Sequence, residues 1–148
     1  MTEKSKEELL KILHKRLKKE QQEYRKWLLS QRKNEILKLA PQYYVREQVI
    51  KEIDESEPTG KVGERYLYTD QITVLLRSGT PLDDICREYF SDIDLYSRYD
   101  FAESVCAAID NCANTLLREE FRERRDKGIY THEPNNTYIA DDEMEENI

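Results

Sequence analysis

The chain has 148 residues, the usual size of a single domain and long enough to bury a substantial core. Charged residues make up 37% of it, and only four Gly and four Pro interrupt it, which argues against an all-β domain with its frequent turns. This composition favours helices with long solvated faces.

The net charge of −7 conceals an asymmetry along the sequence. Residues 1–51 hold 14 Lys and Arg against 7 Asp and Glu, whereas residues 52–148 hold 10 against 24. We therefore expect the two parts to attract partners of opposite charge, or each other.

A capping box predicts where the first helix begins. The Ser5 hydroxyl can accept from the Glu8 amide while the Glu8 carboxylate accepts from the Ser5 amide. A long amphipathic helix should follow and run to about Gln31, because apolar residues recur at helical spacing at Leu10, Leu13, Leu17, Tyr24, Trp27 and Leu28.

A second helix is predicted to begin with Asn34 as its N-cap. Its apolar residues keep roughly helical spacing, and Pro41 predicts a kink or a break. Two of the four glycines and one proline lie in residues 56–63, which we expect to form a loop that ends the first helical pair.

Two shorter helices are predicted next. Asp70 can cap the first, which Ser78 and Gly79 should stop. The second short helix should begin at Thr80, which offers a capping hydroxyl, and Pro81 suits the first helical position. The carboxylates of Asp83 and Asp84 would then lie at the positive end of the helix dipole, which they stabilise.

A last long helix is predicted from about Phe101, ended by Lys127 and Gly128. The expected architecture is all-α: a compact bundle of four to five helices with a long N-terminal helix, whose first two helices form an antiparallel pair crossed by the last. Residues 1–128 would form this helical domain, and residues 129–148 an acidic, mobile tail.

Nothing in the local spacing of reactive residues indicates catalysis. The two histidines, His14 and His132, have no Cys, Ser or second His at a productive spacing, so we expect no enzyme, no cofactor and no metal. The three cysteines lack CxxC spacing, which is typical of reduced thiols in a core; they are Cys86, Cys106 and Cys112. The absence of an apolar export or membrane segment predicts a cytoplasmic protein.

The basic first helix offers one binding surface. Its cations fall on about a third of the helix circumference, which would let them follow the phosphates of a nucleic acid; the residues singled out are Lys11, Lys15, Lys18, Arg25, Arg32 and Lys33. The simpler interpretation is a solvated face, which we favour because the whole protein is acidic.

Acidic and tyrosine-rich segments offer a second candidate binding surface. Ten tyrosines are many for this length, and tyrosine is favoured at protein interfaces. The candidate partner-binding residues combine tyrosines around the central loops with the acids of the tail, and are Tyr66, Tyr68, Tyr96, Tyr99, Asp141, Asp142, Glu143, Glu145 and Glu146. A merely solubilising tail is the simpler alternative.

Several short motifs, spread over about residues 24–114, resemble those of an uncharacterised family of small helical proteins. They are Trp27-Leu-Leu-Ser, Glu35-Ile-Leu, Tyr44-Val-Arg-Glu, Leu75-Leu76 with Ser78, Pro81-Leu82 and Cys112-Ala-Asn. This domain-of-unknown-function family occurs on mobile elements, phage or conjugative, of anaerobic Gram-positive bacteria, and the resemblance implies no catalytic or binding residue.

The resemblance implies a kind of partner. Small acidic proteins of mobile elements often bind host proteins, so we expect a non-enzymatic protein-binding module, with an inhibitor of a host nucleic-acid-handling defence enzyme of the anti-CRISPR type as its specific form. The alternative is a nucleic-acid-binding accessory protein that uses the basic first helix. The spacing of Leu10, Leu13 and Leu17 also permits a homodimer.

Overall fold

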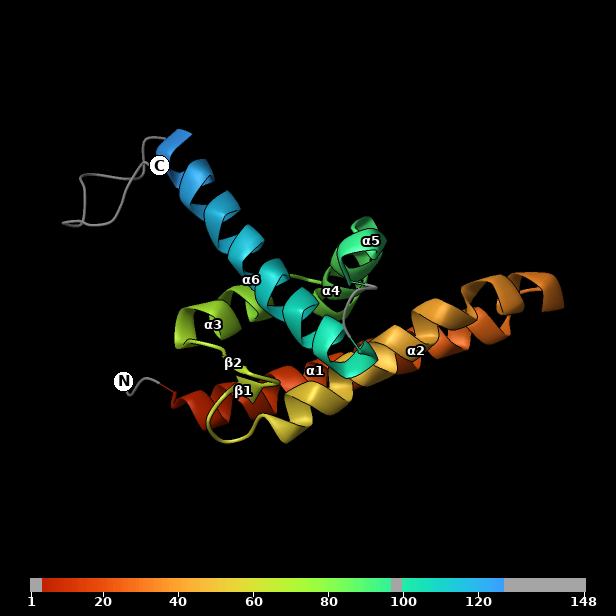
Figure 1. The fold of residues 1–148 in the computed structure, drawn as a ribbon, viewed down its shortest axis with the longest axis horizontal. Helices are drawn as coiled ribbons and strands as arrows, with labels where there is room; N and C mark the ends of the chain where they lie inside the picture. Colours follow the sequence, from red (N-terminus) through yellow and green to blue (C-terminus); the bar gives the residue numbers. More distant parts are fainter. Residues whose placement is uncertain (1–3, 97–99, 127–148) are drawn as a thin grey trace. The chain divides into compact units, whose positions relative to one another are not determined.

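The computed structural model describes residues 4–96 and 100–126. Six helices occur in these ranges, and a two-stranded antiparallel β hairpin lies between the second and third (Figure 1). The elements are α1 (Lys6–Leu29), α2 (Lys33–Glu55), β1 (Lys61–Val62), β2 (Arg65–Tyr66), α3 (Thr69–Arg77), α4 (Pro81–Ser91), α5 (Ile93–Tyr96) and α6 (Phe101–Asp126). The predicted all-α class is confirmed, whereas the β hairpin replaces part of the predicted loop.

The chain divides into two compact units, Met1–Leu117 and Arg118–Ile148, and the boundary falls within α6. The first unit contains α1 to α5, the β hairpin and the first part of α6. In the second unit the structure describes residues 118–126, the last turns of α6. The predicted domain boundary at residue 128 and the acidic tail lie outside the described residues.

The first two helices form the predicted antiparallel pair (Figure 1). The capping box at Ser5 is present, with Glu8 as its second member. The end of α1 at Leu29 lies two residues before the predicted end, and the Ser30 and Gln31 side chains both donate to the Trp27 carbonyl oxygen.

The second helix begins earlier than predicted and passes through its proline. Arg32 occupies the N-cap and Asn34 lies inside the helix, so the predicted cap was wrong. No break occurs at Pro41. Pro41 lacks a backbone N–H, so α2 loses one hydrogen bond there. The burial of Val49 and Ile53 in the core holds the second half of the helix in place.

Two predicted caps differ in the structure, although the predicted stop at Ser78 is confirmed. Tyr68, not Asp70, is the N-cap of α3, and its amide donates to the Gln71 side chain at 2.8 Å. Thr80 is the N-cap of α4 as predicted, but its hydroxyl lies 3.3 Å from a carboxylate oxygen of Asp84 instead of capping the helix amides.

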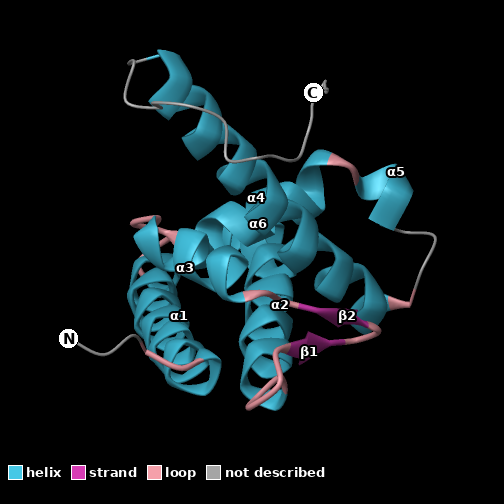
Figure 2. Cartoon of the chain, turned by 90° about the vertical axis from the view of Figure 1, so that its left-hand side faces the viewer, coloured by secondary structure: helices cyan, strands magenta, loops and turns pink. Residues whose placement is uncertain are grey.

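The core lies where α3, α4 and the first part of α6 cover one side of the α1–α2 pair (Figure 2). Residues from all of these elements are fully buried, as is Leu67 between β2 and α3; the largest are Leu10, Leu13, Leu17, Ile53, Leu67, Ile72, Leu75, Leu82, Ile85 and Ile109. The thiol of Cys106 in α6 donates to a Glu52 carboxylate oxygen of α2 at 3.3 Å, which joins the two helices directly.

All three cysteines are free and buried, as their number and spacing predicted. In the part of the chain that the structure describes, no helix combines the length and the apolar character needed to cross a bilayer.

Two leucines of α1 test this packing. Leu17 is fully buried and Leu29 is 58% exposed, so Leu17→Ala should lower the free energy of unfolding by about 2–5 kcal/mol. Leu29→Ala should change it by less than about 0.5 kcal/mol. Urea denaturation followed by circular dichroism measures both, and equal effects would contradict the assignment of the core face.

Candidate functional site

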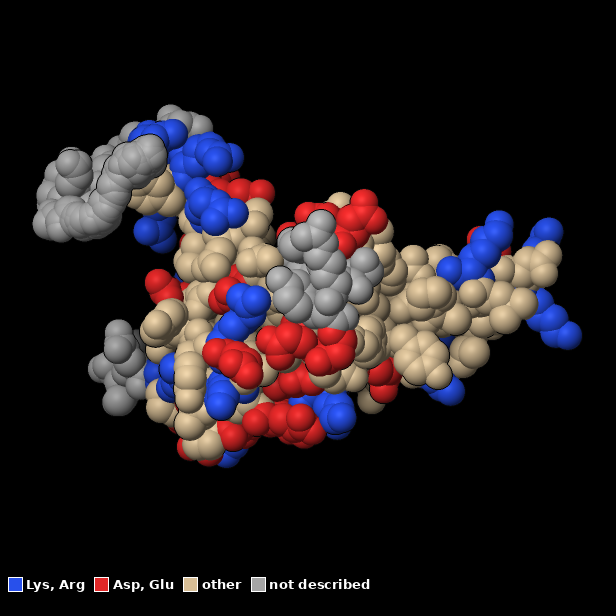
Figure 3. Space-filling view, in the orientation of Figure 1, with Lys and Arg blue, Asp and Glu red and all other residues tan. Residues whose placement is uncertain are grey.

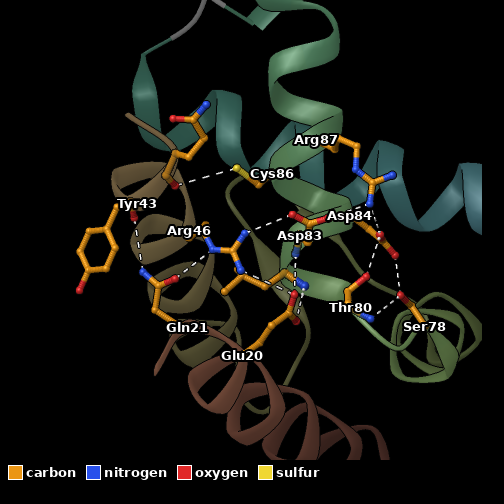
Figure 4. Close-up of polar contacts among 12 residues, drawn as sticks. Glu20, Gln21, Tyr43, Arg46, Ser78, Thr80, Asp83, Asp84, Cys86 and Arg87 are labelled. Carbon is orange, nitrogen blue, oxygen red and sulfur yellow. Dashed lines mark hydrogen bonds and ion pairs between the residues drawn. The ribbon is translucent and has the colours of Figure 1, made fainter. Parts of the chain in front are cut away.

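A buried arginine lies at the centre of a polar network (Figure 4). Arg46 of α2 is 3% exposed. Its Nε donates to Gln21 Oε1 at 3.0 Å, and its Nη atoms lie 3.4 Å from Asp83 Oδ1 and 3.7 Å from Glu20 Oε2. The Tyr24 ring covers the guanidinium, with its centroid 4.0 Å from the central carbon. Because a buried charge must be paired, this network joins α1, α2 and α4.

Glu20 also caps α4 from the neighbouring helix (Figure 4). Its two carboxylate oxygens accept from the amides of Leu82 and Asp83 at 2.9 and 2.8 Å. Burial raises the pKa of the Glu20 carboxyl, and the two amides and Arg46 oppose that rise. Glu20 therefore performs the capping that the sequence assigned to the Thr80 hydroxyl.

The remaining polar groups of the network bond to one another. Gln21 is buried, and its amide nitrogen donates to Glu47 at 2.9 Å. The predicted dipole-stabilising carboxylates lie in the first turn of α4, and Arg87 donates to both, at 2.8 Å to Asp83 and 3.0 Å to Asp84. These contacts indicate a structural role for the network.

The buried thiols are poorly suited to nucleophilic chemistry. Burial raises the pKa of Cys86 to about 11. Burial, followed by the charge of Glu52, raises the pKa of Cys106. Both thiols are therefore protonated at neutral pH, and a thiol is a far weaker nucleophile than its thiolate.

The predicted tyrosine surface is partly described. Tyr66 is 51% exposed and Tyr68 67% exposed, and a lysine nitrogen lies about 6 Å from each ring centroid. Tyr68 borders a shallow, open groove along α3 with Asp70 and Arg77. Tyr96 ends α5. Outside the described residues lie the other members of the prediction: Tyr99, Asp141, Asp142, Glu143, Glu145 and Glu146.

The predicted basic surface does not continue along one helix. Its first four members are exposed on α1, at Lys11, Lys15, Lys18 and Arg25. Arg32 and Lys33 lie beyond the end of α1, in the turn and at the start of α2, because the chain reverses after Leu29. The prediction of one basic face that includes these two residues was therefore wrong.

The turn end of the α1–α2 pair carries a feature that the sequence reasoning missed. Between Gln21 and Val45 only Leu28 is buried. We call residues 22–44 the helical tip; in Figure 1 it extends to the right of the elements that cover the other half of the pair. Four large apolar side chains of the tip are exposed by 49–73%: Trp27, Leu29, Leu37 and Tyr44.

Helix α2 has two apolar faces, of which the core covers one. Val45, Val49 and Ile53 are buried in the core. Leu37, Pro41 and Tyr44 are spaced by four and three residues, so they share another face, and all three are exposed. This second set was visible in the sequence, but its exposure was not, since helical spacing is the same for covered and uncovered faces.

The helical tip is also basic. Residues 22–44 hold five Lys and Arg against two Glu, and Figure 3 shows these cations gathered at the far end of the tip, on the right of the view. Arg25, Arg32 and Lys33, predicted as nucleic-acid contacts, belong to this group. The tip thus combines exposed aromatic and aliphatic side chains with positive charge.

The buried network can be tested at Glu20. Its side chain is 14% exposed, and Glu20→Gln removes a charge that faces Arg46 and an acceptor for α4. We expect the free energy of unfolding to fall by about 3 kcal/mol. Glu23→Gln, an exposed substitution one turn along the same helix, is the matched control and should leave urea unfolding nearly unchanged. An equal free energy of unfolding for the two variants would show that the network contributes little to the stability of the folded state.

Comparison with family models identifies a match over residues 9–117 to a family described as a protein of unknown function, DUF3848. Comparison with curated proteins and with solved structures finds no match. The matched segment contains the Arg46 network and the helical tip, and it extends beyond the motifs that suggested such a family. Since the match covers more than half of the sequence, the chain belongs to the DUF3848 family.

Proposed function

We propose that this protein is a non-enzymatic protein-binding module that docks its partner on the helical tip. The observation that carries the proposal is the uncovered apolar face of α2, where Leu37 is 73% and Tyr44 71% exposed. Exposed apolar patches rimmed by polar residues mark interaction sites, and aromatic side chains contribute strongly to binding energy.

The spacing of this face suits a particular mode of recognition. Leu37, Pro41 and Tyr44 present anchors at positions i, i+4 and i+7 of one helix, which is how a helix fills an apolar groove on another protein. The surrounding cations favour a groove with an acidic rim, because complementary charge speeds association and excludes other partners.

The specific form of this proposal follows the resemblance noted in the sequence. In this form the chain is a protein of a mobile element, and its partner is a host protein. The target would be a nucleic-acid-handling defence enzyme, which the chain would inhibit. Tyr66 and Tyr68 form the rival docking surface, since both rings are exposed.

Nucleic-acid binding is the alternative function. Four cations of α1 are exposed and would provide the phosphate contacts, at Lys11, Lys15, Lys18 and Arg25. Lys11 is also paired with Glu7 at 3.5 Å, which weakens its share of such a surface.

Paired substitutions distinguish the surfaces. Leu37→Ser with Tyr44→Ser should reduce binding at least about tenfold, which corresponds to about 1.4 kcal/mol, because two anchors are lost. Tyr66→Ser with Tyr68→Ser is the matched control and should retain most binding. The measurement is affinity capture from a nuclease-treated lysate of the encoding organism, then calorimetry with the purified partner.

The contrary result is equally informative. Loss of binding in the Tyr66 and Tyr68 variant, with the tip variant unaffected, would move the docking site to the tyrosine surface. All four substituted side chains are largely exposed, so each variant should keep the thermal stability of the parent chain.

A charge reversal tests the alternative. If nucleic acid rather than protein is retained, reversal to Glu of Lys11, Lys15, Lys18 and Arg25 should abolish its retention and the dependence of binding on salt. In the protein-binding proposal, reversal of Lys11, Lys15 and Lys18 alone leaves the captured protein in place, because these three positions lie outside the helical tip.

A further inference from the structure

Three potential metal ligands meet where the first half of α1 passes the end of α2. His14 lies on α1, Asp54 lies in the last turn of α2, and Glu57 follows two residues after that helix. One ligand atom from each side chain lies within 4.8 Å of the other two. His14 Nε2 is 3.8 Å from Asp54 Oδ1.

The packing of the helical pair fixes these positions. His14 follows Leu13 and Asp54 follows Ile53, and both of these apolar residues are fully buried in the core. The imidazole is 20% exposed and the Asp54 carboxylate 59% exposed. The ring is therefore held at the edge of the core, while the carboxylate can adjust towards a ligand from solvent.

Among the described residues, the one basic side chain at ion-pair distance from Asp54 is His14, itself one of the three potential ligands. Within residues 4–96 and 100–126, neither Asp54 nor Glu57 has a Lys or Arg within ion-pair distance. The Lys6 ammonium lies in this region but donates to the Thr59 carbonyl oxygen at 3.1 Å. A metal cation bound between the two carboxylates would supply the positive charge that no lysine or arginine provides here.

We propose that His14, Asp54 and Glu57 bind a divalent transition-metal ion of the zinc type. One imidazole nitrogen with two carboxylate oxygens suits Zn²⁺, Co²⁺ or Mn²⁺, whereas Mg²⁺ and Ca²⁺ prefer oxygen ligands alone. Water completes the coordination, because three protein ligands leave a position open.

Only modest movement is needed to form the site. Ligand atoms around a tetrahedral Zn²⁺ lie about 3.3 Å apart, so the three atoms must approach one another by about 1.5 Å at most. Rotation of the solvent-exposed Asp54 side chain supplies such a movement. The bound ion ties α1 to the end of α2 and stabilises the folded state by mass action.

This site lies outside the helical tip and does not depend on the proposed function. Local spacing does not indicate this site, because Asp54 follows His14 by 40 positions and no other potential ligand lies at a local spacing from His14. The antiparallel pairing of the two helices creates the cluster.

Calorimetric titration of the full chain with Zn²⁺, in the presence of a phosphine reductant, tests the proposal. We expect one site whose affinity falls at least about tenfold in His14→Ala and in Asp54→Asn. The matched controls are His132→Ala, at the other histidine, and Glu55→Gln, at the exposed carboxylate beside Asp54; both should bind as the parent does.

The thermal midpoint provides a second readout. Zn²⁺ should raise the thermal midpoint of the parent and of the control variants, but not that of Asp54→Asn. Asp54 is exposed, so this variant should fold even if His14→Ala does not. Absence of Zn²⁺ binding to the parent, or equal binding by parent and Asp54→Asn, would overturn the proposal.

Paramagnetic broadening by Mn²⁺ locates the ion. Amide signals near residues 14, 54 and 57 should broaden first. Broadening confined to the acidic residues 141–146 would place the ion elsewhere and refute the site.

Discussion

The buried guanidinium of Arg46 is the constraint on which the arrangement of the helices depends. Arginine does not lose its charge on burial, so the surrounding structure must supply partners within hydrogen-bond or ion-pair distance. Glu20 and Asp83 supply the negative charge, and Gln21 supplies a neutral acceptor. Because Glu20 also accepts from the first amides of α4, the same network stabilises the start of that helix.

This network also marks a change in the α1–α2 pair. On one side of it the leucines of α1 pack against α2 and the elements that cover them. On the other side lies the helical tip, in which Leu28 is the one buried residue. Tyr24 closes the packed half by covering the guanidinium, and the exposed anchors Leu37 and Tyr44 follow beyond it. The packed half of the pair thus presents an apolar face on one rigid element, which would lower the entropic cost of the proposed docking.

The two proposed sites use different parts of the same helical pair. The helical tip exposes an apolar face at Leu37 and Tyr44, although α4 reaches the base of the tip, where the Cys86 thiol lies 3.9 Å from the Gln42 carbonyl oxygen. The cluster of His14, Asp54 and Glu57 arises because antiparallel packing brings the start of one helix to the end of the other. Both follow from pairing two helices of nearly equal length and covering only half of the pair.

The sequence by itself determined the features that depend on neighbouring residues. The all-α class, the capping box at Ser5, the stop at Ser78 and the start of α4 at Pro81 all follow from local hydrogen bonding and backbone preference. Only the tertiary structure decided that Glu20 caps α4 and that one apolar face of α2 stays uncovered. Helical periodicity marks an apolar face but not what covers it, and contacts between distant residues depend on how the helices pack.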